Sequence, residues 1–225
     1  MIDVKRVHQA RKEKGLTQDF LARELNMSRP SYIKFEEEEK ELTLGQVRIL
    51  ERLLGVSLTE SPEETRSNIE KLESMMLAFI SLAGDEGDGR ITKTKLAKLL
   101  YFADAQTFIN RGGRSISNLT YRRLPQGPVA YEYLQLVDEM VDSHVLDIKF
   151  SGLAQMIRTV EPVILTELNL EADEIELIKS IATKWKDKRT DALVNYTHEH
   201  PTWKNAGEYE PINMNLLRNW PKPIY

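Results

Sequence analysis

His198 and His200 are the residues whose type best suits a metal site, because imidazole nitrogen is a common zinc ligand. Their spacing argues against that use. Residues two apart on a helix point to different faces, and the sequence offers no cysteine and no well-spaced carboxylate to complete a ligand set. We therefore expect a structural or surface role for this pair, and neither a metal nor a cofactor.

The loop that begins at Asp85 is a second candidate, since its acidic and glycine residues loosely resemble a calcium-binding loop. Gly87, Gly89 and Arg90 fall where the ligands and the turn glycine belong, and Leu96 replaces the bidentate glutamate. The chain also contains no phosphate-binding loop, no nucleophile elbow and no HExxH motif. We expect that the protein is not an enzyme.

A different chemistry, DNA reading, is indicated by the stretch from Val4 to Gly55. Gly15-Leu16-Thr17-Gln18 ends one helix and opens the next, and Asn26-Met27-Ser28 forms a turn. A third helix follows over 29–36, and Thr43-x-x-Gln46 opens a fourth. The stripe expected to be buried on the second helix comprises Phe20, Leu21 and Leu25.

This module resembles the Cro and phage-repressor class of helix-turn-helix proteins, the XRE family, over most of its length. The resemblance implies that Gln18 contacts a phosphate and supports the recognition helix. It implies contacts to base edges or the adjacent backbone from Ser28, Arg29, Ser31 and Lys34. Arg29 suits bidentate contact with guanine in the major groove.

The charge along this module changes sign. Residues 1–35 hold eight Lys or Arg against four Asp or Glu, whereas residues 36–41 hold one lysine against five glutamates. Family members commonly place Asn, Lys or Arg in this loop, where Glu37, Glu39 and Glu41 stand here. Carboxylates near phosphates weaken binding, so operator affinity is expected to be low unless the run points away from DNA.

The larger remainder resembles the Panacea domain, the antitoxin domain also found in the SocA proteolytic adaptor. The resemblance rests on Lys95-Leu96-x-Lys98-Leu99-Leu100-Tyr101-x-Ala103-Asp104, on Tyr121 through Gly127-Pro128-Val129-x-Tyr131, and on the late His198 and Trp203. It covers roughly residues 70–205. It implies a mainly helical domain with a small antiparallel sheet that binds a toxin protein directly.

Several residues of these motifs are candidates for binding that partner, either at the surface or as its scaffold: Tyr101, Asp104, Tyr121, Gly127, Pro128 and His198. The same residues could equally form the core of the fold, because most aromatic stripes at helical spacing are core. We expect a structural role for Gly127-Pro128.

The expected fold class is mainly α (α+β). We expect a helix-turn-helix domain over 1–58, a helical linker over 59–69 that starts at the capping box Ser61-Pro62-Glu63-Glu64, and a Panacea-like domain over 70–225. The strands expected in the larger domain are 119–124, 145–150 and 156–160, with a turn over 125–128 and a docked C-terminal tail.

The leading hypothesis is an antitoxin that neutralises a cognate protein toxin by direct binding and regulates its own operon through the helix-turn-helix. A transcriptional repressor with a ligand- or partner-sensing domain, or a proteolytic adaptor, are the alternatives. The absence of cysteines and of a long apolar run predicts a cytoplasmic protein without a membrane partner. A homodimer is possible, although no coiled-coil seam is visible.

Overall fold

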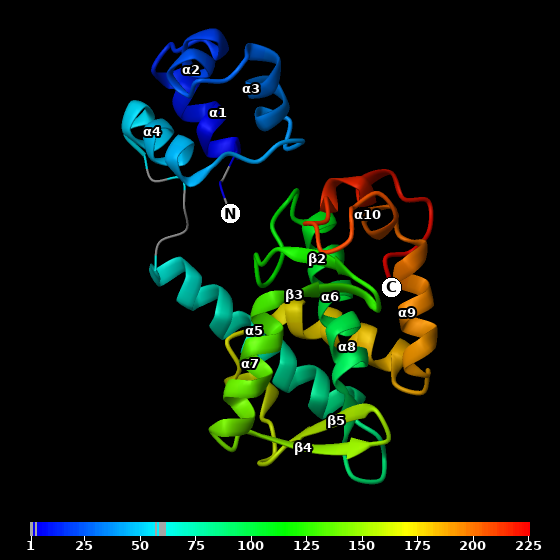
Figure 1. Ribbon diagram of the computed structural model, residues 1–225. Coiled ribbons are helices and arrows are strands. Elements are labelled where there is room, and N and C mark those ends of the chain that lie inside the picture. The colour runs from blue at the N-terminus through cyan, green and yellow to red at the C-terminus, as the bar shows by residue number, and fades with distance from the viewer. Residues whose placement is uncertain (1, 3, 57, 59–61) are drawn as a thin grey trace. The chain divides into compact units, whose positions relative to one another are not determined.

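The computed structural model describes residues 2, 4–56, 58 and 62–225 (Figure 1). The chain divides into two compact units, Met1–Thr65 and Arg66–Tyr225, here called unit 1 and unit 2. The expected linker start at Ser61 lies outside the described residues. Within the described part of the chain, every helix is too short or too polar to cross a lipid bilayer.

Unit 1 is a bundle of short helices around one small core. The helices are α1 (Val4–Glu13), α2 (Gln18–Glu24), α3 (Arg29–Glu36) and α4 (Leu44–Leu54). Its core consists of Val7, Ala10, Leu21, Ala22, Leu25, Tyr32, Phe35, Leu50, Leu54 and Leu58. The expectation that Phe20 belongs to this core is wrong, because its side chain is 41% exposed and Ala22 is buried in the stripe instead.

The helix ends of unit 1 are set by capping residues. Thr17 accepts a hydrogen bond from the Phe20 amide, and Ser28 accepts one from the Ser31 amide. Thr43 and Gln46 form a capping box at α4, and Gly55 closes it in the left-handed conformation. These caps satisfy backbone groups that short helices would otherwise leave unpaired.

Unit 2 begins with the long helix α5 (Pro62–Ala83), whose residues 64–67 are exposed. The remaining elements are β1 (Ile91–Thr92), α6 (Lys93–Asn110), β2 (Tyr121–Leu124), β3 (Gly127–Ala130), α7 (Tyr131–Asp142), β4 (Leu146–Ser151), β5 (Ala154–Thr159), η1 (Leu165–Glu167), α8 (Ala172–Trp185), α9 (Thr190–Glu199), α10 (Pro201–Lys204) and η2 (Met214–Asn219). The fold is therefore mainly helical with small antiparallel sheets, as expected.

Two small sheets flank the helices. One has the strand order β1-β5-β4 and the other is the β2–β3 hairpin. The expected turn over 125–128 is too long, because Gly127 and Pro128 already pair with Leu124 and Arg123. The sequence contained a proline and a glycine, which usually mark turns, but here both lie in a short buried strand.

Helix α6 is the centre of unit 2 (Figure 1). It contacts β1, β3, β5, α8, α9 and η2, and every residue from Lys95 to Ala105 is buried. Thr92 caps its first turn, where its hydroxyl accepts a hydrogen bond from the Lys95 amide at 3.0 Å. A helix that is covered on all sides must find internal partners for its polar side chains.

Candidate DNA-reading and partner-binding sites

The recognition helix α3 is held in place by a buried ion pair. Arg11 Nε donates to Glu36 Oε1 at 2.6 Å, and Gln18 Nε2 donates to Glu36 Oε2 at 2.7 Å. Burial alone would raise the pKa of Glu36, but the hydrogen bonds from Arg11 and Gln18 hold it below its ordinary value. Gln18 therefore supports α3, while its contact with a phosphate stays a prediction.

The other predicted DNA-contacting residues lie on or beside α3. Ser28, Arg29 and Lys34 are exposed, and Arg29 and Lys34 have no ion-pair partner among the residues described. Ser31 is half-buried, and its hydroxyl accepts a hydrogen bond from Lys40. Contact with bases and phosphates requires exposed arginine and lysine side chains, and this helix has them.

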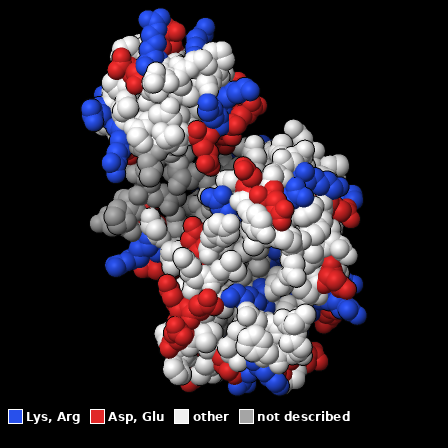
Figure 2. Space-filling model, in the orientation of Figure 1, with Lys and Arg blue, Asp and Glu red and all other residues white. Residues whose placement is uncertain are grey.

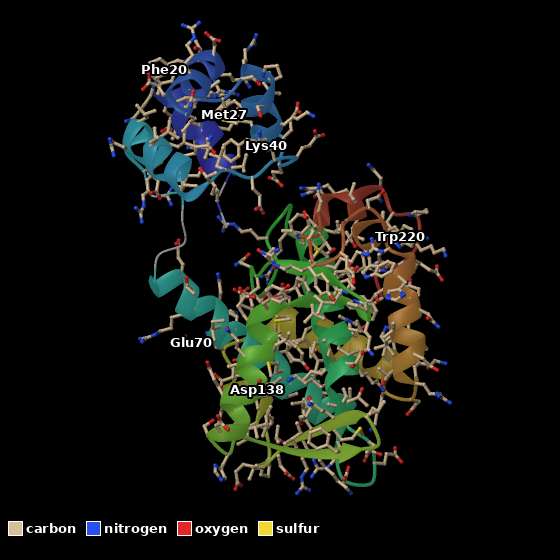
Figure 3. All side chains as sticks on the ribbon, in the orientation of Figure 1. Phe20, Met27, Lys40, Glu70, Asp138 and Trp220 are labelled. Atoms are coloured by element: carbon tan, nitrogen blue, oxygen red, sulfur yellow. The ribbon has the colours of Figure 1, made fainter. Side chains whose placement is uncertain are left out.

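The acidic loop folds back beside the recognition helix. The Lys40–Ser31 hydrogen bond brings residues 37–41 next to the first turns of α3, and the glutamates at 37, 39 and 41 are exposed. Figure 2 shows acidic and basic side chains side by side on this unit, and Figure 3 labels Lys40. Of the two alternatives for the glutamates, this position beside α3 favours repulsion of DNA phosphates over a loop that points away from DNA.

In unit 2, four polar residues recur every third position along α6: Lys95, Lys98, Tyr101 and Asp104. Three residues advance an α-helix by about 300°, so each member points about 60° away from the one before. The four side chains therefore reach different neighbouring segments. All four are buried.

The two lysines bind backbone carbonyls. Lys95 Nζ donates to the carbonyl oxygens of Lys186 and Lys188 at 2.5 and 2.9 Å, beyond the end of α8. Lys98 Nζ donates to the carbonyl oxygen of Pro128 in β3 at 2.8 Å. Burial lowers the pKa of Lys98 to about 7.

Tyr101 and Asp104 bind the segments on the other sides. The Tyr101 hydroxyl lies 2.9 Å from His200 Nδ1 and 2.8 Å from Thr202 Oγ1. Asp104 accepts hydrogen bonds from the Ser117 amide, the Ser117 hydroxyl and the Tyr121 hydroxyl. Burial raises the pKa of the Asp104 carboxyl, while the bonds from Ser117 and Tyr121 oppose the rise.

The turn of the β2–β3 hairpin is clamped by stacked side chains. The His198 ring stacks on Trp203 with centroids 3.8 Å apart, and the Arg123 guanidinium lies 4.2 Å from the Trp203 ring. Trp203 Nε1 donates to the carbonyl oxygen of Leu124 at 3.0 Å. Burial, and next the charge of Lys98, lower the pKa of His198.

An aromatic cluster fills the space between α6, α8, α9 and the C-terminal segment. Phe102 stacks on Trp185 with centroids 5.4 Å apart. His200 packs against Tyr196 and against Trp220, and Trp220 is labelled in Figure 3. Burial lowers the pKa of His200 to about 4, so this imidazole is neutral near pH 7. Trp220 docks the tail, as the sequence indicated.

The predicted partner-binding residues are mostly internal. Five are buried, namely Tyr101, Asp104, Tyr121, Gly127 and Pro128, and His198 is half-buried under Trp203. In this conformation the buried five cannot be a contact surface, because their polar atoms already bind within the protein. This outcome corresponds to the alternative that the motif forms the core of the fold.

The two histidines do not approach each other as ligands would. His198 stacks on Trp203, whereas His200 binds Tyr101 through Nδ1. Over the part of the chain that the structure describes, no group of three His, Cys, Asp or Glu side chains could hold a metal ion. Asp85 instead accepts hydrogen bonds from the amides of Gly87 and Asp88, which closes its own loop.

Three residues outside the predicted partner-binding set lie at the surface beside this scaffold. Tyr131 is 44% and Tyr209 53% exposed, and Arg122 connects them. The Arg122 guanidinium lies 5.2 Å from the centre of the Tyr131 ring, and its Nη1 donates to the carbonyl oxygen of Tyr209 at 3.3 Å. Tyr131 ends the motif that suggested the family, but nothing in the sequence near Tyr209 connects it to Arg122.

Comparison of the chain with models of protein families gives two matches. Residues 96–204 match the family described as antitoxin SocA-like, Panacea domain, and residues 7–61 match the helix-turn-helix family. Both families are of non-enzymatic kinds. No curated protein and no solved structure matches the chain. The family models therefore find a helix-turn-helix of the XRE type followed by an antitoxin SocA-like Panacea domain, in the order predicted from the sequence.

Proposed function

We propose that this protein is the antitoxin of a toxin–antitoxin pair and that unit 2 neutralises a cognate protein toxin by direct binding. The observation that carries the proposal is the match of residues 96–204 to the antitoxin-like Panacea domain. The polar side chains of α6 form hydrogen bonds with other segments of the fold, so we assign them a structural role and not a catalytic one.

The surface best suited to the toxin is the group formed by Arg122, Tyr131 and Tyr209. Tyrosine and arginine dominate protein interfaces because they offer a large contact area at a low cost in conformational entropy. The contacts of Arg122 with the Tyr131 ring and with the backbone carbonyl of Tyr209 hold the arginine in place before a partner arrives, which reduces the cost of binding.

We assign an indirect role to the buried motif residues. Tyr121 is the first residue of β2, directly before Arg122, and its hydroxyl is fixed by Asp104. Gly127 and Pro128 form the paired strand behind it. These residues determine the shape of the contact surface without touching the toxin.

Co-expression with the neighbouring gene tests the proposal. A small adjacent reading frame should be lethal alone and tolerated with this protein, and residues 66–225 should suffice for rescue. Tyr131→Ala combined with Tyr209→Ala should abolish rescue, while Phe20→Ala, an equally exposed aromatic in unit 1, should not. A folded unit 2 that fails to rescue cells would refute the proposal. Shortened toxin lifetime would instead indicate a proteolytic adaptor.

We also propose that unit 1 lets the protein bind its own promoter. The exposed Arg29 and Lys34 on α3 support this role, and the acidic loop predicts weak affinity. Gel-shift titrations over a range of salt concentrations measure both points. A change of affinity caused by a small molecule, and not by the toxin, would favour a ligand-sensing repressor instead.

A further inference from the structure

Exposed apolar side chains gather on one segment of unit 2, residues 145–164, which contains the β4–β5 hairpin. Phe150 is 65% exposed and Leu153 at the hairpin tip is fully exposed. Val145, Val160 and Ile164 are also exposed. A monomeric surface rarely concentrates apolar side chains in this way, so the hairpin has the properties of an interface.

One edge of this hairpin also offers backbone groups for pairing. Among the residues that the structure describes, β4 lies at the edge of the sheet and pairs with β5 alone. The Val160 amide donates to the carbonyl oxygen of Val145, and the direction of backbone groups alternates along a strand. The backbone groups of Leu146, Ile148 and Phe150 therefore face away from β5, and such an edge is a template for another strand.

We propose that the strand which binds this edge is β4 of a second copy of the protein, antiparallel to the first and centred on Ile148. In this register Ile148 lies opposite Ile148 of the second copy, and Leu146 lies opposite Phe150. These are the residues with outward-facing backbone groups, so they form the hydrogen-bonded pairs, with about six bonds across the interface.

Charges select the same register. Asp147 lies opposite Lys149 of the second copy in a pair without mutual hydrogen bonds, where side chains approach most closely. Asp147 Oδ2 already binds Arg90 and Arg158 of its own chain, but the side chain stays partly exposed. Lys149 is exposed without an ion pair among the described residues. Moving the centre by one residue places either two Asp147 or two Lys149 side chains opposite each other, which is unfavourable.

The exposed Phe150 also gains apolar neighbours across the interface. Side chains alternate between the two faces of a strand, so Leu146, Ile148 and Phe150 share one face. In the antiparallel register Phe150 lies opposite Leu146 of the second copy, close to Ile148. The pairing thus covers apolar surface that each copy alone leaves in water.

This inference is independent of the proposed toxin. A dimer would present two copies of unit 1, and helix-turn-helix proteins read two half-sites as dimers. The mass of the full chain in solution, measured by light scattering over a range of concentrations, should rise toward twice the monomer mass.

Single cysteines test the register, because the native sequence has none. Under mild oxidation, Ile148→Cys should form a disulfide-linked dimer, since the α-carbons of such a pair lie about 5.5 Å apart. Ser151→Cys is the control. Its thiol is more exposed, yet the two copies would lie about 20 Å apart in this register.

Two substitutions should dissociate the dimer without unfolding the chain. Phe150→Pro removes an amide that β5 does not use, and edge strands tolerate proline at such positions. Lys149→Glu opposes Asp147 of the second copy with a like charge. Each should raise the dimer dissociation constant roughly tenfold or more, with the melting temperature retained. Lys204→Glu, the same charge change on α10, should have no effect.

A chain that stays monomeric at its highest soluble concentration would overturn the proposal. So would a dimer that neither substitution weakens, or equal disulfide yields from the two cysteine variants. If the chain is monomeric and Phe150→Pro abolishes toxin binding, the edge serves a strand of the toxin and self-pairing is refuted.

Discussion

Gly127 should tolerate a side chain poorly, because both its backbone conformation and its neighbours oppose one. Its φ of +99° lies in the region that favours glycine. A β-carbon there would stand 2.5 Å from Thr197 Oγ1 and 2.9 Å from Lys98 Cε, both closer than real contacts allow. Thr197 and Lys98 are fully buried, so neither side chain can move into solvent.

The cost of Gly127→Ala has two parts. The left-handed backbone costs a non-glycine residue about 1–2 kcal/mol, and overpacking a dense site adds about 1–3 kcal/mol. Gly112→Ala is the matched control, because Gly112 has φ +69° and nothing lies within 4 Å of an added β-carbon. It should lose only the backbone part, about 1–2 kcal/mol.

Urea unfolding followed by tryptophan fluorescence measures both variants. The three tryptophans, at 185, 203 and 220, all belong to unit 2, so this signal reports its unfolding selectively. Gly127→Ala should lose at least about 1 kcal/mol more unfolding free energy than Gly112→Ala, with an unchanged m-value. Equal losses would show that contact with Lys98 and Thr197 is not what requires glycine.

Three further predictions concern the buried motif and the DNA-reading helix. Because the pKa of Lys98 is lowered to about 7 by burial, the unfolded chain binds a proton that the folded chain does not between this pH and about 10. The unfolding free energy should therefore rise with pH over that window. Lys98→Met should make the rise smaller in urea titrations at pH 7 and pH 9, and a part should remain because burial also lowers the pKa of Lys95. Asp104→Asn should cost about 1–3 kcal/mol of unfolding free energy, because one amide oxygen cannot replace a carboxylate that accepts three hydrogen bonds; an unchanged urea midpoint would contradict this. Arg29→Ala should abolish promoter binding in gel shifts and leave toxin neutralisation intact, whereas Glu37→Lys should strengthen binding and steepen its salt slope by about one unit.

Local signals in the sequence were enough to predict unit 1. Thr17 and Thr43 cap the helices that they were expected to open, and Ser28 in the expected turn caps α3. Gly15 and Gly55 adopt the left-handed conformation that ends a helix. Each of these features depends on residues three or four positions away. Phe20 shows the limit, since helical periodicity identifies an apolar stripe but not how far neighbouring helices cover it.

The buried polar motif could not be placed from the sequence in the same way. The partners of Lys95, Lys98 and Tyr101 lie about 30 to 100 residues further along the chain. Polar residues on a helix normally face water, and only the tertiary fold shows that α6 is enclosed. For the same reason Gly127-Pro128 resembled a turn, because its strand exists only through pairing with β2.

The enclosure of this motif separates the residues that identify the domain from those available to a partner. Substitution of Lys98, Tyr101 or Asp104 would disturb the fold itself, whereas Arg122, Tyr131 and Tyr209 have exposed atoms whose replacement leaves the core packed. A scaffold of this kind can change its partner by changing surface residues while the internal hydrogen bonds stay constant. The motif therefore predicts the architecture of unit 2, and the identity of the toxin must be sought in the side chains that the motif leaves outside.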